Sequence, residues 1–234
     1  GGNDSKDYWG DTSGGEDEEP TENPNASKPR YIWIDAAANF PDFANSKENI
    51  ARDLALAKDA GFTDIVVDVR PTTGDVLFKT NLVDQVKFMY AWIGSNYTKV
   101  ERTATWDYLQ AFVDEARKQG LRIHAAINTF VGGNQIDGGT GLLYRDQSKA
   151  EWATQMNMQV GITSVMNTSE STKFFNPAHP EVQTFLCDLL KDLAGYDLDG
   201  IFLDRGRFLN LQADFSEESR KQFEEYMGGI RIQN

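Results

Sequence analysis

Five polar side chains stand where predicted strands end, and together they could carry acid–base or nucleophilic chemistry. They are Asp35, Asp68, Arg70, Asn128 and Asp204. In parallel strands such ends meet at one edge of the sheet. A carboxylate there can serve as a nucleophile, as a base, or as the partner of a nearby cation.

Asp204 is the strongest catalytic candidate of the five. It follows the apolar stretch GIFL at 200–203 and precedes Arg205, Gly206 and Arg207. Burial and neighbouring cations could therefore both tune its ionisation. Arg205 and Arg207 are candidates for holding the carboxylate charged or for binding hydroxyl groups of a substrate.

Asp68 is the second catalytic candidate, and Arg70, two residues further along the same strand, is a candidate for orienting a substrate. A plain ion pair between these two side chains would close the strand end equally well. Asp35 is a candidate substrate ligand, although capping the segment that follows is the simpler role for it. We expect Asn128 to hydrogen-bond a substrate hydroxyl.

The remaining reactive side chains indicate structural roles. His124 lies mid-strand, where a hydrogen-bonded core histidine is the usual case, and His179 precedes Pro180 as a turn residue before a helix. Cys187 is the single cysteine and cannot form an internal disulfide. Two histidines and one cysteine make a poor set of zinc ligands, so we expect no metal and no other cofactor.

Predicted strands and helices alternate from Tyr31 onward. The strands cover 31–36, 64–70, 121–130 and 199–204. The helices cover 48–61 and 106–119, then a stretch that follows Pro180, and a last one that Ser216 caps and that ends near Tyr226. This alternation indicates parallel strands joined by right-handed crossovers.

A doubly wound sheet and a (β/α)8 barrel both begin in this way. The segment DAAANF at 35–40 lacks the glycine-rich phosphate loop that would favour the doubly wound sheet. Long insertions at 71–103 and 131–178 follow the second and third strands, on the side where barrels carry functional loops. We therefore predict an α/β fold, a TIM (β/α)8-type barrel, with residues 30–234 forming its N-terminal half of four βα units.

The insertion at 71–103 is rich in aromatic side chains, namely Phe78, Phe88, Tyr90, Trp92 and Tyr97. Aromatic faces suit the apolar faces of sugar rings, so Trp92 is a candidate substrate-binding residue. Packing of the insertion onto the barrel would explain the same residues without any ligand.

Charge and composition exclude two kinds of partner. The 234 residues carry a formal net charge of −13, which repels a polyphosphate backbone, so we expect no nucleic-acid partner. No apolar run reaches the ~18 residues that a membrane span needs. Residues 1–29 hold eight acidic residues and two lysines and are predicted to form a disordered acidic tether.

Several segments resemble the family 10 glycosyl-hydrolase-like proteins, which are bacterial barrels distantly similar to the α-amylase type. They occur in the order found in that family and cover nearly all of 31–228. The matching segments are YIWID (31–35), GFTDIVVDVRPTTGDVLF (61–78), GLRIHAAINTF (120–130), NPAHPEV (176–182), YDLDGIFLD (196–204) and DFSEESRKQFEEYMG (214–228).

The resemblance implies a barrel that acts on carbohydrate outside the cytoplasm, as a secreted protein or a cell-envelope lipoprotein. Similar lipoproteins of Bacteroidetes are associated with glycan use. Contact with a membrane is then expected only through a lipid anchor upstream of Gly1.

The resemblance also implies site residues. Barrels of the amylase type carry a nucleophilic aspartate at the end of strand four, which matches Asp204, while their acid glutamate and a further aspartate would lie beyond Asn234. The sequence departs from the pattern at Arg205, where a second acid often follows, and at Phe202, where amylases have arginine. Hydrolysis usually needs two carboxyls, about 5–5.5 Å apart for retention and about 6.5–9.5 Å apart for inversion.

Three hypotheses follow from these observations. The first is a glycoside hydrolase that acts on poly- or oligosaccharide at the cell envelope. The second is a non-catalytic carbohydrate-binding lipoprotein on the same scaffold, because a fold does not determine a function. The third is a structural or assembly module that binds no glycan.

Overall fold

The computed structural model describes residues 28–206, 213, 214 and 216–226. The predicted tether lies outside the described residues except for Lys28 and Pro29, and so does the candidate site residue Arg207.

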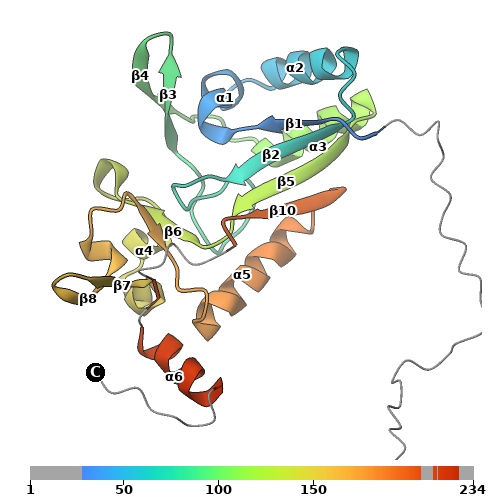
Figure 1. The fold of residues 1–234 in the computed structure, drawn as a ribbon. Coiled ribbons are helices and arrows are strands. Elements are labelled where there is room, and N and C mark those ends of the chain that lie inside the picture. The colour runs from blue at the N-terminus through green and yellow to red at the C-terminus, as the bar shows by residue number, and fades with distance from the viewer. Residues whose placement is uncertain (1–27, 207–212, 215, 227–234) are drawn as a thin grey trace, which may run out of the picture.

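A parallel sheet of four strands forms the centre of the described structure (Figure 1). The strands follow one another in the spatial order β1-β2-β5-β10, with every neighbouring pair parallel. The strands are β1 (Tyr31–Ile34), β2 (Asp64–Arg70), β5 (Arg122–Asn128) and β10 (Gly200–Asp204). Each matches a predicted strand, so the predicted βα alternation is confirmed.

Helices connect the strands and bury one face of the sheet (Figure 1). On that face Ile34, Val67 and Ile123 belong to the hydrophobic core. Gly120 terminates one of these helices where the sequence predicts, with a φ of 69° that favours glycine. The predicted helices that connect the strands are α2 (Lys47–Asp59), α3 (Tyr108–Gln119) and α5 (Pro180–Leu193). After β10 the chain forms α6 (Glu217–Tyr226), which lies away from the sheet (Figure 1).

Among the helices that connect the strands of the sheet, one has no counterpart in the prediction. Helix α1 (Ala36–Phe43) begins directly after β1, although Pro41 lies inside it. Its N-cap is Asp35, and its buried residues Phe40 and Phe43 join the core. The segment is short and contains a proline, and both features argue against a helix in sequence terms.

The two insertions leave the carboxyl ends of β2 and β5, as predicted, and fold into small antiparallel units. The first contains the hairpin β3 (Phe88–Ile93) and β4 (Asn96–Glu101). The second pairs β6 (Val131–Asn134) with β9 (Thr172–Phe174), and β7 (Gln155–Met158) with β8 (Gly161–Ser164). It also holds α4 (Leu142–Arg145) and the short 3-10 helices η1 (Ile136–Gly138), η2 (Gln147–Trp152) and η3 (Val165–Asn167).

The other face of the sheet is open to solvent along β1 and β10. Tyr31, Trp33 and Phe202 lie on it with exposed fractions of 44%, 54% and 36%, and the ring of Phe202 contacts the rings of both other residues. The ring of His124 joins this group from β5. The alternation of side chains places these residues on the face that looks into a barrel.

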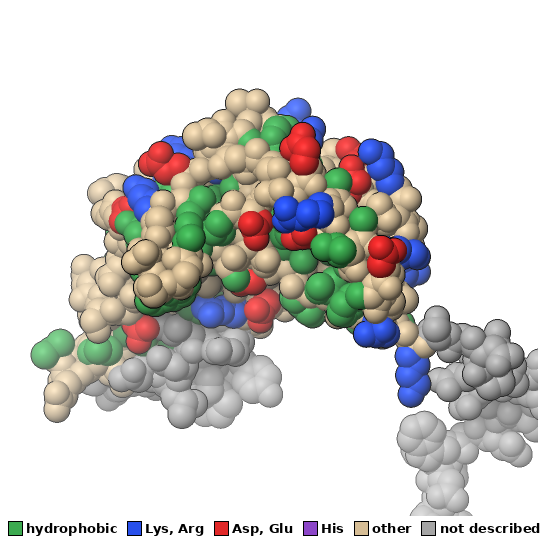
Figure 2. Space-filling view, turned by 90° about the horizontal axis from the view of Figure 1, so that it is seen from above, with side chains coloured by type: hydrophobic (Ala, Val, Ile, Leu, Met, Phe, Trp, Pro, Cys, Tyr) green, Lys and Arg blue, Asp and Glu red, His purple; other side chains and the backbone are tan. Residues whose placement is uncertain are grey.

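The described surface is mixed in charge. Figure 2 shows lysine and arginine side chains interspersed with aspartate and glutamate on one face, without a continuous basic patch there. Within the described ranges, no helix is long and apolar enough to span a membrane.

Candidate functional site

Three carboxylates gather at the carboxyl edge of the parallel sheet. Asp35 follows β1, Asp68 lies near the end of β2, and Asp204 is the last residue of β10. The negative charges of Asp35 and Asp204 both act on the ionisation of Asp68, so both lie within electrostatic reach of Asp68. The structure therefore brings together the aspartates that the sequence places at strand ends.

Asp68 holds the most unusual of these carboxyl groups. Burial raises its pKa to about 7, the charges of Asp35 and Asp204 act in the same direction, and hydrogen bonds from the backbone N–H groups of Arg70 and Ala36 act against them. A carboxyl group that titrates near neutrality can both donate and accept a proton under ordinary conditions. This property is what a general acid or base requires.

A β-bulge separates Asp68 from Arg70 in the register with β5. Bulges turn side chains away from the regular alternation of a strand and are common beside active sites. Here the bulge breaks the alternation that would place both side chains on one face. Asp68 therefore remains at the carboxyl edge of the sheet, while the side chain of Arg70 points into the protein.

Arg70 is fully buried and binds the backbone of the connection after β5. Its guanidinium donates to the carbonyl oxygens of Asn128 at 2.5 Å and Thr129 at 3.2 Å, and to that of Val131. Burial lowers its pKa to about 10. We expected Arg70 to orient a substrate or to pair with Asp68; instead the side chain has no exposed surface and forms no ion pair with Asp68.

Asn128 is likewise used inside the protein. It is buried, and its side-chain amide donates to the backbone oxygen of Arg70 at 2.9 Å. We expected Asn128 to contact a substrate, but little of its side chain is exposed. Its amide already binds Arg70, the residue that anchors the connection after β5.

Asp35 takes the capping role that the sequence analysis gave as the simpler alternative. Its Oδ2 atom accepts a hydrogen bond of 2.7 Å from the backbone N–H of Ala38. It still lies close enough to Asp68 to act on its pKa. Asp35 thus caps the N-terminus of α1 and adds negative charge to the carboxyl edge of the sheet.

Asp204 is exposed at the carboxyl edge of the sheet. Its Oδ1 atom accepts a hydrogen bond of 2.8 Å from the backbone N–H of Arg205, and its own carbonyl oxygen accepts one of 2.8 Å from the N–H of Thr129. Arg205 adopts a φ of 48°, a left-handed conformation that is uncommon for residues other than glycine. The strand therefore ends in a sharp turn that presents the Asp204 carboxylate to solvent.

The aromatic residues of the first insertion divide between the two interpretations given for them. Phe78 is buried in the core, so its role is to pack the insertion onto the sheet. Trp92 and Tyr97, in the β3–β4 hairpin, are 67% and 58% exposed, and their ring centroids lie 5.2 Å apart. These two rings are free to meet a ligand.

Both histidines have the structural roles expected of them. The Nε2 atom of His124 lies 2.7 Å from Oδ2 of Asp64 inside the protein, and His179 caps α5 by accepting a hydrogen bond from the N–H of Glu181. No three His, Cys, Asp or Glu side chains in the described part of the chain are arranged to hold a metal ion.

Tyr108 is a residue near the site that the sequence analysis missed. It is the first residue of α3, it is buried, and its hydroxyl has no hydrogen-bond partner among the described residues. Burial raises the pKa of the phenol strongly, and the charges of Asp68 and Asp35 raise it further. Only the packing of α3 against β2 reveals this proximity, since no local pattern marks the residue.

The sequence matches the profile of the family described as Glycosyl hydrolase-like 10 over residues 28–229. The chain belongs to this family. A relative of the chain, an S-layer-related protein of Niallia circulans, is 31% identical over 211 residues. That match covers 87% of this chain and 13% of the relative, so the chain spans about an eighth of the relative's length.

Solved structures of similar fold confirm the TIM-type barrel. The α-L-fucosidase isoenzyme 2 of Paenibacillus thiaminolyticus has a TM-score of 0.53 and 18% identity, over 86% of this chain and 26% of its own. The Flavobacterium johnsoniae chitobiase has a TM-score of 0.51 and 13% identity, over 86% and 27%. A hypothetical protein of Ruminiclostridium thermocellum has a TM-score of 0.50 and 14% identity, over 85% and 88%.

Proposed function

We propose that this chain forms half of the catalytic barrel of a glycoside hydrolase that acts on poly- or oligosaccharide at the cell envelope. The observation that carries the proposal is Asp68, a partly buried carboxyl group with a pKa of about 7, beside the exposed carboxylate of Asp204. Glycosidases use such a pair, in which one carboxyl group transfers a proton and the other acts on the sugar carbon or on water.

The two aspartates take different roles in this proposal. Asp68 donates its proton to the oxygen of the leaving sugar and later recovers one from water, because its pKa allows both directions near neutral pH. Asp204 acts as nucleophile or as the base that stabilises the developing positive charge of the sugar ring. Arg205, next in the chain, is available to bind hydroxyl groups of the substrate.

The proposed location is extracytoplasmic. It is supported by the S-layer-related relative, whose name refers to a protein layer at the cell surface. The protein would then act as a secreted or lipid-anchored enzyme on glycans that it meets outside the cytoplasm.

A second candidate function is glycan binding without turnover. It is favoured by the exposed rings of Trp92 and Tyr97 on a hairpin that extends away from the sheet (Figure 1). In that case Trp92 would contribute more to affinity than Asp204.

The test measures release of reducing sugar from a panel of soluble polysaccharides by the full-length protein. We expect turnover by the wild-type protein, and we expect Asp204→Asn to abolish it while the melting temperature stays nearly the same. Undiminished activity in Asp204→Asn would contradict the hydrolase. Tight binding of a polysaccharide without sugar release, weakened by Trp92→Ala, would favour the second function instead.

A further inference from the structure

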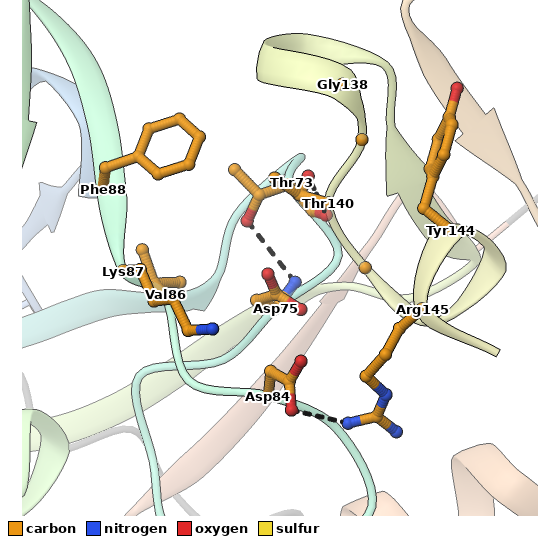
Figure 3. A pocket seen from close by; sticks show the side chains of 12 residues that line it. Thr73, Asp75, Asp84, Val86, Lys87, Phe88, Gly138, Thr140, Tyr144 and Arg145 are labelled. Carbon is orange, nitrogen blue, oxygen red and sulfur yellow. Dashed lines mark hydrogen bonds and ion pairs between the residues drawn. The ribbon is translucent and has the colours of Figure 1, made fainter.

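A polar cavity lies between the two insertions, apart from the carboxylates at the strand ends (Figure 3). Its volume is about 300 Å³, at the lower end of the range for small-molecule sites. The first insertion contributes six residues between 73 and 88 to its wall, and the second contributes six residues between 138 and 145.

Charged side chains of both signs face the same space in this cavity. Figure 3 shows Asp75, Asp84, Lys87 and Arg145 directed toward one another around it. Arg145 donates to Asp84 at 2.7 Å, and the ring of Phe88 forms part of the wall above them. The two positive and two negative side chains balance one another, and they offer both hydrogen-bond donors and acceptors.

Asp75 has acceptor capacity to spare. It is partly buried, it forms no ion pair within the described residues, and its carboxylate accepts a hydrogen bond from the backbone N–H of Gly141. An ionised carboxylate has about four lone-pair sites, so most of them remain open to a ligand.

The cavity is held in place by close contacts between the two insertions. Thr140 donates through its hydroxyl to the carbonyl oxygen of Thr73 at 2.8 Å. Gly141 has a φ of 82°, and a Cβ atom there would lie 2.8 Å from that same carbonyl and 2.6 Å from Cα of Gly133. Glycine at this position thus allows the second insertion to close against the first and to form the cavity without a ligand.

We propose that this cavity is a carbohydrate subsite that binds one neutral sugar unit, an inference that rests on the proposed function. An anion would meet Asp75 and Asp84, and a cation would meet Lys87 and Arg145. A neutral polyhydroxyl ring, in contrast, can donate to the carboxylates and accept from the cations at once, with its apolar face toward Phe88.

A row of aromatic rings leads from the cavity along the hairpin and gives a longer glycan a place to continue. Phe88 lies 6.0 Å from Tyr90 between ring centroids, Tyr90 lies 5.4 Å from Tyr97, and Tyr97 lies 5.2 Å from Trp92. In this proposal a glycan bound in the cavity continues along this row of rings, the binding path, to the exposed Trp92.

The test is saturation-transfer NMR on the full-length protein with glucose, galactose, L-fucose and N-acetylglucosamine as separate probes. We expect at least one sugar to bind, and we expect Asp84→Ala and Lys87→Ala each to weaken it about tenfold. Lys87 is exposed and forms no ion pair within the described residues, so its variant should fold normally. Asp188→Ala, an exposed carboxylate of α5 that lines the neighbouring cavity, is the matched control and should bind as the wild type does.

The same probes with Asp204→Asn separate this inference from the proposed function. If the cavity is the subsite, Asp204→Asn binds the sugar while it loses sugar release from polysaccharide. Binding that is lost in Asp204→Asn but kept in Asp84→Ala and Lys87→Ala would overturn the subsite and leave the hydrolase standing. Absence of binding by all four probes to the wild-type protein would also overturn it, whatever the hydrolysis assay gives.

Discussion

The backbone N–H of Arg70 donates to Oδ1 of Asp68 at 3.2 Å, while the guanidinium of the same arginine turns away to the carbonyl oxygens of the next loop. Because of the bulge between the two residues, the backbone of Arg70 faces Asp68 while its side chain points away from Asp68. Asp68 therefore receives a backbone hydrogen bond from Arg70 beside the one from Ala36, but it forms no ion pair with the Arg70 guanidinium, which would have lowered the pKa of Asp68 much further. The pKa of Asp68 can thus stay near neutrality because the Arg70 side chain points away from it.

Stability should depend on pH through Asp68. Its pKa rises from 3.8 to about 7 on folding, so the folded state binds the proton more tightly. Its contribution to stability is therefore greatest below the unfolded value of 3.8 and declines as pH rises toward about 7. Asp68→Asn, which cannot ionise, should raise the melting temperature above pH 7 by about 3 °C or more.

The control for this prediction is a melting curve of the same variant near the unfolded pKa of 3.8, where wild-type Asp68 is largely protonated once folded. There the two proteins should melt at similar temperatures. An equal difference at both pH values would mean that the burial of Asp68 does not set its pKa.

Removal of the Arg70 side chain should destabilise the protein. Arg70→Met leaves the buried carbonyl oxygens of Asn128, Thr129 and Val131 without their donor, at a cost of about 3 kcal/mol or more. Arg52→Met, on the exposed surface of α2, should leave the urea midpoint close to that of the wild type. Urea denaturation of both variants measures the difference, and equal midpoints would show that Arg70 does not hold the loop.

The buried pair of Asp64 and His124 should make the opposite contribution to acid stability. Burial alone would raise the pKa of Asp64, but hydrogen bonds from Thr63 and His124 and the charge of Arg122 outweigh it and lower the pKa. Its stabilisation is present above the unfolded value of 3.8 and is lost as pH falls through the folded value. Asp64→Asn should therefore lower the melting temperature at neutral pH, with a gap that narrows in acid; a constant gap would contradict this reasoning.

Two aromatic residues of the first insertion should respond differently to truncation. Phe78→Ala should cost about 3–5 kcal/mol, because Phe78 is buried in the core. Trp92→Ala should cost little stability, because Trp92 is 67% exposed, and it should weaken glycan binding instead. Thermal melts and affinity electrophoresis in polysaccharide gels measure the two effects, and unchanged migration of Trp92→Ala would remove Trp92 from the binding path.

Much of the fold could be predicted because periodic apolar residues and helix caps are local signals. DIVVDVR at 64–70 forms β2 with the predicted ends, and Gly120 ends α3 as its position indicates. Helix α1 escaped prediction because Pro41 argues against a helix, while tertiary packing of Phe40 and Phe43 favours one. The small hairpins of the insertions depend on contacts between distant segments, which local patterns do not reveal.

The candidate site could be predicted in part. Alternation along strands located Asp35, Asp68 and Asp204 at one edge, and the structure brings them together. The position of Arg70 could not be predicted, because one bulge residue reverses the direction of its side chain. The approach of Tyr108 to the carboxylates and the cavity around Asp75 both arise from packing between separate segments.

The pH dependence of sugar release by the full-length protein and by Asp68→Asn tests the central claim most directly. We expect the wild-type rate to change with pH around pH 7, where Asp68 titrates. Asp68→Asn should lack this pH dependence, and its kcat should be about 10²- to 10⁴-fold lower. A variant that keeps the wild-type rate and the same pH profile would contradict the claim that Asp68 carries the proton.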